Sequence, residues 1–156
     1  MGKWQQVALA AGGVLALDQL SKLAVWLWLA PVRQIKIIPG LFDLTFYMNT
    51  GVAFGMMSGD RSLWRILVLT GAALAALGII VVFIIKTRLQ DRLFIIALSL
   101  VAGGAIGNVV DRVRMGAVID FLDVYLGPHH WPAFNLADAG ITVGTALIAI
   151  HFWRSR

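Results

Sequence analysis

Apolar runs long enough to cross a membrane constrain this chain more than any other feature. Residues 66–85 form the clearest run, which contains no charged side chain. Because a helix of about 20 apolar residues crosses the roughly 30 Å hydrocarbon core of a bilayer, we expect this run to span a membrane. Further apolar runs of similar length give four predicted transmembrane helices, at about residues 4–30, 63–85, 93–113 and 137–153. The hydrophobic fraction of 60% also favours an all-α membrane protein, folded as a single domain over residues 1–156.

Positive charges at the ends of the apolar runs indicate how the chain is oriented. Lys3, the linker at residues 86–92 and the C-terminal arginines all fall on one side of the predicted helices. The positive-inside rule makes this side cytoplasmic, with both termini inside and outer segments at about residues 31–62 and 114–136. The outer segments also contain basic residues, so the assignment of the cytoplasmic side rests mainly on the short linker at residues 86–92. The net charge of +5 forms no basic patch with interleaved aromatics, so we expect no nucleic-acid partner.

The outer segments contain signals of short strands. Residues 37–57 are rich in aromatic and β-favouring side chains, and turn-forming residues occur at 39–40 and 49–51. We therefore expect a small β-containing extracytoplasmic segment on the membrane surface. The pattern of residues 118–125 fits an extended piece and a short helix equally well.

Charged side chains inside the first predicted helix form a second constraint. Asp18 and Lys22 interrupt the apolar run, and no small-residue cleavage site follows, so we expect the segment to be retained as a membrane helix. The two residues lie at i and i+4 on one helix face, where a buried salt bridge is the simplest interpretation. By helical rise, Asp18, Asp111 at the end of the third helix and Asp138 at the start of the fourth reach the same level of the membrane.

The third predicted helix combines small and polar residues. Glycines at positions 103, 104 and 107 are typical of closely packed membrane helices. Asn108 and Arg112 follow on one face, with Asp111 beside them. Two interpretations remain open: Asp111 pairs with Arg112, or Asn108 and Arg112 donate hydrogen bonds to a peptide carbonyl or a lipid oxygen.

The sequence favours chemistry without a metal or other cofactor. The chain has no cysteine, which excludes disulfides and a thiol nucleophile. Its histidines lie at positions 129, 130 and 151, and they do not form a metal-binding motif.

Carboxylates near the outer face are the remaining candidates for catalysis. Asp120, Asp123 and Asp138 have no lysine near them in sequence. Two carboxylates in a confined site share one proton, so that one can activate water while the other polarises a carbonyl group. Spacing alone allows either Asp120 or Asp123 as the partner of Asp138. A structural alternative is that these carboxylates cap helices or pair with Arg114.

Five blocks of the sequence, in order, resemble the bacterial lipoprotein signal peptidase family, also called signal peptidase II. The blocks are Asp18-Gln19-x-Ser21-Lys22, Asn49-Thr50-Gly51-Val52-Ala53-Phe54-Gly55, Gly104-Ala105-x-Gly107-Asn108-x-x-Asp111-Arg112, Val118-Ile119-Asp120-Phe121 and Phe134-Asn135-x-Ala137-Asp138. Each block alone is weak, but five in this order on a chain with four predicted membrane helices are specific.

The resemblance implies an intramembrane aspartyl endopeptidase of the bacterial inner membrane. Its substrate would be a diacylglyceryl-modified prolipoprotein, cut before the lipidated cysteine near the outer face of the membrane, and we expect a monomer in contact with membrane lipid. The implied catalytic pair is Asp120 and Asp138. Residues 37–57 would form a lid over the substrate. The implied site residues are Asn49, Asn108, Arg112 and Asn135 around the substrate and Asp18, Lys22 and Asp111 in support.

Two other functions compete with a peptidase. A small transporter or channel subunit would use Asp18, Asp111 and Asp138 for ion coupling, and Asp120 would matter less because it lies outside the helices. A non-catalytic membrane scaffold would use the carboxylates only to pair with Lys22 and Arg112.

Overall fold

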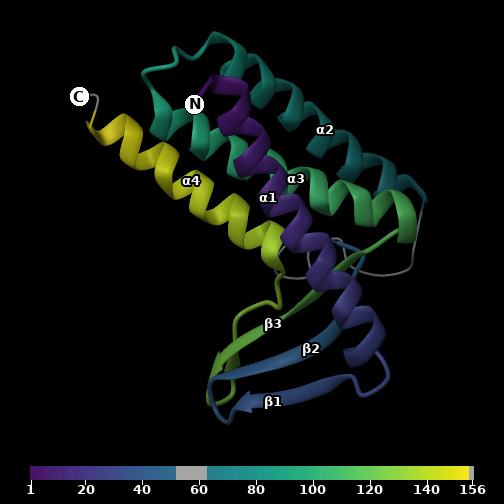
Figure 1. The fold of residues 1–156 in the computed structure, drawn as a ribbon. Helices are drawn as coiled ribbons and strands as arrows, with labels where there is room; N and C mark the ends of the chain where they lie inside the picture. The colour runs from purple at the N-terminus through teal and green to yellow at the C-terminus, as the bar shows by residue number, and fades with distance from the viewer. Residues whose placement is uncertain (52–62, 155–156) are drawn as a thin grey trace.

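Four long helices and a small sheet make up the part of the chain that the structure describes. The computed structural model describes residues 1–51 and 63–154. The helices are α1 (Lys3–Ala24), α2 (Leu63–Lys86), α3 (Arg92–Met115) and α4 (Leu136–Arg154), and α1 continues into a π-helical turn, η1 (Val25–Leu29). Figure 1 shows the helices side by side, with the sheet at one end of them. Each helix is long and apolar enough to cross a membrane, so the predicted fold class is confirmed.

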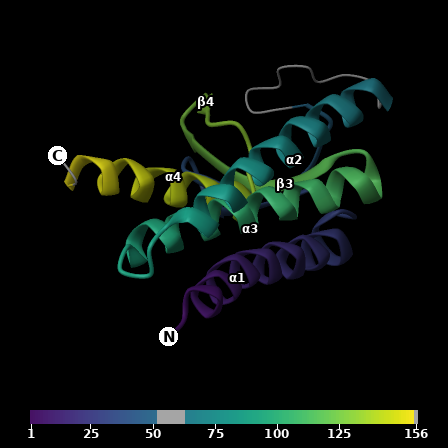
Figure 2. The same cartoon turned by 90° about the horizontal axis from the view of Figure 1, so that it is seen from above.

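The third helix forms the centre of the bundle. Half of the most apolar window of α3 is buried, against 6% in α2 and 11% in α1 and α4. Figure 2 shows α3 between α1 and α2, and α3 also packs along α4. The other helices therefore expose most of their apolar side chains outward, as expected for surfaces that contact lipid.

Glycines on α3 allow its neighbours to approach closely, as the sequence predicted. A methyl group on Gly104 would collide with the backbone carbonyl of Ala137 in α4. A methyl group on Gly107 would come within 2.6 Å of a carboxylate oxygen of Asp18 in α1. The small face of α3 thus brings the polar residues of α1 and the start of α4 together.

The sheet contains four antiparallel strands in the order β1-β2-β3-β4. The strands are β1 (Gln34–Ile38), β2 (Phe42–Asn49), β3 (Val118–Leu126) and β4 (His129–His130). The prediction of short strands in residues 37–57 is confirmed by β2, whereas β1 begins before this range and only its last two residues fall within it. Residues 52–57 of the same prediction lie outside the described residues. The segment at 118–125, left open by its sequence pattern, is the strand β3.

An apolar cluster fixes β3 against the end of the first helix. Val25 and Leu29 of η1 pack with Ile119 and Phe121 of β3, and all four are buried. Asp120 lies between these two anchored strand residues. The packing of the sheet on the helices therefore determines where the backbone of Asp120 lies.

Candidate active site

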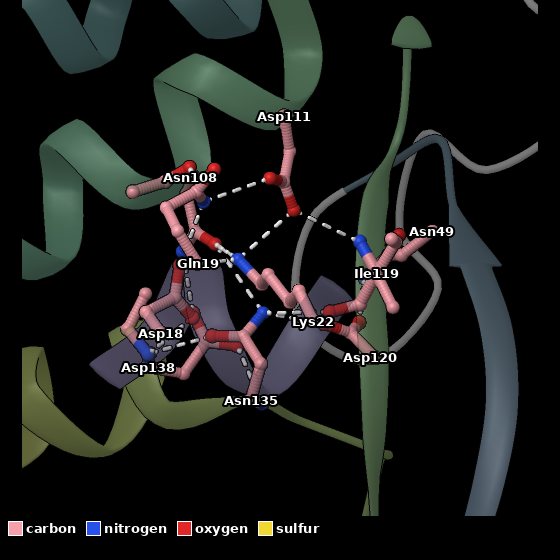
Figure 3. A network of polar contacts seen from close by, with 12 residues as sticks. Asp18, Gln19, Lys22, Asn49, Asn108, Asp111, Ile119, Asp120, Asn135 and Asp138 are labelled. Carbon is pink, nitrogen blue, oxygen red and sulfur yellow. Dashed lines mark hydrogen bonds and ion pairs between the residues drawn. The ribbon is translucent and has the colours of Figure 1, made fainter. Parts of the chain in front are cut away.

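Asp120 and Asp138 reach one cavity from different elements. Asp120 is the third residue of β3, and Asp138 lies in the first turn of α4. Both line a cavity of about 1170 Å³. Figure 3 shows the polar network that surrounds them.

Asn135 links the two carboxylates. Its side-chain Nδ2 donates a hydrogen bond to Asp120 Oδ1 over 2.7 Å. Its backbone N–H lies 3.4 Å from Asp138 Oδ2, and its Oδ1 accepts a 2.9 Å hydrogen bond from the backbone N–H of Asp138. Because the Asn135 side chain is fully buried, it fixes both carboxylates relative to one another.

Two more asparagines complete the hydrogen bonds of the pair. Asn49 Nδ2 donates to Asp120 Oδ2 over 2.8 Å, and Asn49 Oδ1 accepts from the backbone N–H of Gly51. Asn108 Nδ2 donates to Asp138 Oδ1 over 2.8 Å. Each carboxylate thus has one side-chain amide donor of its own, besides its bond to Asn135.

Lys22 lies between two carboxylates beneath the site. Its Nζ is 2.8 Å from Asp18 Oδ2 and 2.9 Å from Asp111 Oδ2, and all three side chains are almost completely buried. The predicted pairing of Asp18 with Lys22 is confirmed. Asp111 also pairs with Lys22, across two helices, rather than with its neighbour Arg112.

The same ion cluster holds the backbone beside each candidate catalytic residue. Asp18 Oδ1 accepts a 2.9 Å hydrogen bond from the N–H of Ala137, which precedes Asp138. Asp111 Oδ2 accepts a 3.2 Å hydrogen bond from the N–H of Ile119, which precedes Asp120. The cluster therefore connects both halves of the site through one lysine.

Gln19 belongs to this cluster, and residue reasoning gave it no role. Its Nε2 donates to Asp18 Oδ2 and Asp111 Oδ1, each over 3.1 Å. The sequence spacing did indicate this role, because Gln19 and Lys22 are three residues apart on one helix and therefore face the same neighbours.

Arg112 and Asp123 also line the cavity but stand apart from the catalytic network. Arg112 Nη2 lies 3.5 Å from the backbone carbonyl oxygen of Gly51. The Asp123 carboxylate accepts a 2.9 Å hydrogen bond from His130 Nδ1. The structure thus joins Asp120 to Asp138 through Asn135, and it joins Asp123 to a histidine instead.

The surroundings of Asp120 favour its protonated form. Burial raises the pKa of the Asp120 carboxyl to about 7. The hydrogen bond from Asn49 opposes this rise in the pKa, and the negative charge of Asp138 adds to it. Near neutral pH one carboxyl group of the pair can therefore hold a proton while the other is ionised, the state that a water-activating pair requires.

Within residues 1–51 and 63–154, no group of three or more histidine or acidic side chains has the geometry to hold a metal ion.

Comparison with known proteins assigns the chain to a family. The model of the family described as signal peptidase (SPase) II matches residues 10–154. The chain belongs to the signal peptidase II family. The resemblance in the five sequence blocks is thereby confirmed, and the protein is a multi-pass membrane peptidase of the aspartic class.

Relatives named lipoprotein signal peptidase match over nearly the whole chain. The protein from Syntrophus aciditrophicus is 45% identical, covering 91% of this chain and 88% of its own length. The protein from Geobacter metallireducens is 44% identical, covering 90% and 85%.

Two solved bacterial membrane enzymes have a similar fold. One aligns with a TM-score of 0.82 at 28% identity, covering 94% of this chain and 91% of its own. The other aligns with a TM-score of 0.77 at 33% identity, covering 95% and 87%.

Proposed function

We propose that this protein removes the signal peptide from prolipoproteins by cleaving before the lipidated cysteine, with Asp120 and Asp138 as its catalytic pair. Family membership supports the reaction. The observation that carries the assignment of residues is that both carboxyl groups line one cavity and that Asn135, buried behind it, bonds to both of them.

The proposed mechanism is hydrolysis by a carboxylate pair that shares one proton. Asp138, ionised, removes a proton from a water molecule, and the resulting hydroxide attacks the carbonyl carbon of the scissile peptide. Asp120, protonated, donates its hydrogen bond and then its proton to the carbonyl oxygen. When the tetrahedral intermediate collapses and its C–N bond breaks, Asp138 gives the proton it took from water to the leaving nitrogen, and a hydroxyl proton of the intermediate returns to Asp120. The raised pKa of Asp120 supports its role as the acid.

Polar side chains around the pair hold the substrate. Asn108 and Arg112 project from α3 and Asn49 from the end of β2, and all three line the cavity. Their N–H groups can bind substrate carbonyls, and such bonds gain strength in a poorly hydrated site. Asn135 orients the pair, while the buried cluster of Asp18, Lys22 and Asp111 supports the backbone beside it.

Orientation and assembly form part of the same proposal. The pair lies where α4 begins next to the sheet, and the sheet is the extracytoplasmic part of the protein, so the site lies near the outer face of the bacterial inner membrane (Figure 1). Both termini are then cytoplasmic. A substrate anchored by its lipid reaches this level by diffusion within the membrane. The proposal includes a monomer as the working unit. The lid proposed for residues 37–57 includes residues 52–57, which the structure does not describe.

The decisive experiment replaces each carboxyl group by its amide. We expect Asp120→Asn and Asp138→Asn each to lower kcat on a diacylglyceryl-modified prolipoprotein peptide by at least about a thousandfold, because each removes one half of the acid–base pair. The measurement is the release of signal peptide by the purified protein in detergent, with thermal unfolding as the check on folding.

Asp91→Asn is the matched control, since Asp91 is a carboxylate that does not line the cavity and lies at the start of α3, at the other end of that helix from Asn108 and Arg112. It should keep kcat within about tenfold of the parent protein. Normal turnover by a folded Asp120→Asn or Asp138→Asn protein would remove the catalytic assignment. Loss of ion flux with normal cleavage would favour a transporter.

A further inference from the structure

Residues of α4 and residues of the sheet both line the cavity, and polar side chains are more frequent among the sheet residues. One wall follows α4 away from Asp138 and includes Ala139, Ile141 and Val143. The other follows the sheet and includes polar side chains of β2, β3 and β4: Thr45, Tyr47, Asp123 and His130. The first wall belongs to a helix that crosses the membrane, and the second belongs to the sheet at its end (Figure 1).

His130 is held in a fixed position on the sheet wall. Its Nδ1 lies 2.9 Å and 3.1 Å from the two carboxylate oxygens of Asp123. Its ring stacks on Tyr125, with the centroids 4.5 Å apart and the planes 10° from parallel. The Tyr125 hydroxyl in turn donates to Asp43 Oδ1 over 3.1 Å. The carboxylate of Asp123 and the ring of Tyr125 together fix the orientation of the His130 ring.

The other ring nitrogen of His130 is available to a ligand. The side chain is 50% exposed, whereas that of Asp123 is only 13% exposed. Across residues 1–51 and 63–154, Nε2 forms no hydrogen bond. Because the carboxylate of Asp123 accepts from Nδ1–H, the neutral ring carries its proton there and leaves Nε2 as an acceptor. The pair thus offers an oriented acceptor on the wall of the catalytic cavity.

We propose that Asp123 and His130 form a subsite for the mature part of the substrate, the polypeptide that follows the scissile bond. This inference rests on the proposed function. The signal peptide is apolar and stays in the hydrocarbon region, so it takes the α4 wall. The mature chain is hydrophilic and leaves toward water, so it takes the sheet wall. There His130 Nε2 accepts a hydrogen bond from a substrate N–H or O–H group.

Strand geometry indicates which substrate residue reaches this subsite. Asp123 lies three positions beyond Asp120 on β3, about 10 Å away at roughly 3.3 Å per residue. An extended peptide has the same rise. Because cleavage before the cysteine makes that cysteine the first mature residue, the second and third mature residues lie opposite Asp123 and His130. A hydroxyl, amide or amine at these positions suits the acceptor, whereas a carboxylate is repelled by Asp123.

Two lipopeptides and a neighbouring histidine test the subsite. One substrate continues for three residues beyond the diacylglyceryl-modified cysteine, and the other ends at that cysteine as an amide. His130→Ala should raise KM for the long substrate by about tenfold, the effect of one lost hydrogen bond, with kcat within about twofold. The same variant should leave cleavage of the short substrate unchanged, because the short substrate has no residue that reaches His130. His130→Gln, which retains an acceptor, should recover part of the loss in KM.

His129→Ala is the matched control, since His129 lies next to His130 in β4 but does not line the cavity. It should resemble the parent protein on both substrates. An unchanged KM for the long substrate in His130→Ala would overturn the subsite. Equal losses on long and short substrates would also overturn it, because they would indicate a structural role for His130. Failure of the parent protein to cleave either substrate would instead refute the proposed function.

Discussion

The two candidate catalytic residues differ in how the fold holds them. Asp120 sits on a strand whose neighbours on either side, Ile119 and Phe121, are buried in the apolar cluster with η1. Asp138 sits in the first turn of a helix whose start is bonded to Asp18. The position of Asp120 thus depends on apolar packing, and the position of Asp138 depends on the buried ion cluster.

The raised pKa of Asp120 predicts how activity depends on pH. If the protonated Asp120 is the acid, kcat/KM falls about tenfold per pH unit above its pKa of about 7, because the proton is lost as the pH rises. Asn49→Ala removes a hydrogen bond that lowers this pKa, so the alkaline limb of the profile should move to higher pH. The measurement is kcat/KM from pH 5 to pH 9.

Thr45→Ala serves as the control for that profile, because Thr45 lines the cavity without a hydrogen bond to Asp120. Its alkaline limb should coincide with that of the parent protein. A limb that stays in place or moves to lower pH in Asn49→Ala would show that Asp120 is not the titrating acid.

Local spacing predicts contacts within a helix but not those between helices. The pairing of Asp18 with Lys22 follows from their i, i+4 separation. The second partner of Lys22, Asp111, depends on how α1 and α3 are rotated against each other, which no single helix encodes. Sequence spacing also could not decide whether Asp120 or Asp123 is the partner of Asp138. Asn135 bonds to Asp120 and His130 bonds to Asp123, and both of these residues lie on a different segment of the chain.

At the scale of elements, the glycine face of α3 sets the depth at which the polar residues meet. Gly104 and Gly107 allow α4 and α1 to approach so closely that Asp18 reaches the start of α4. Larger residues there would separate Lys22 from Asp111 and the two halves of the site from each other.

Gly107→Ala tests this packing. Its methyl group would come within 2.6 Å of Asp18 Oδ2, so we expect a loss of about 1–3 kcal/mol in unfolding free energy and lower peptidase activity. Gly71→Ala in α2 is the matched control, because a methyl group there meets nothing within 4 Å. It should leave the unfolding free energy unchanged or raise it by up to about 1 kcal/mol, from helix propensity. Equal effects of the two changes, measured by denaturant unfolding in micelles, would contradict the packing argument.

Most helices and strands were predictable from the sequence, whereas β3 and η1 were not. The helices follow from apolar length and β1 and β2 from turn residues. The first four residues of β3 are all buried, and its later residues are partly exposed without strict alternation. A strand that is covered on both faces at one end carries no period-two pattern, so its sequence fits a helix equally well. The π-helical turn η1 gave no signal either, since its five residues are apolar throughout.

At the scale of the whole molecule, the polar network lies where the helices meet the sheet, and the helices expose many large apolar side chains elsewhere. This arrangement divides the protein into an apolar part suited to contact with lipid and a polar part suited to the membrane interface. The position of the site therefore depends on which side of the membrane the sheet occupies.

Single introduced cysteines can show on which side of the membrane the sheet lies, because the chain contains no cysteine of its own. Leu126 at the end of β3 is 74% exposed, so Leu126→Cys should react with a membrane-impermeant thiol reagent in intact cells. Arg88→Cys, in the linker between α2 and α3, should react only after the cells are permeabilised. The reverse pattern would place the sheet and the site on the cytoplasmic side.

The lysine shared by Asp18 and Asp111 has a consequence for the nascent chain. Ile119 and Ala137 take up their positions only when the first and third helices have both been inserted and have brought three charges together. We therefore expect a half-inserted polypeptide to lack the arrangement of Asp120 and Asp138 on which the proposed cleavage depends.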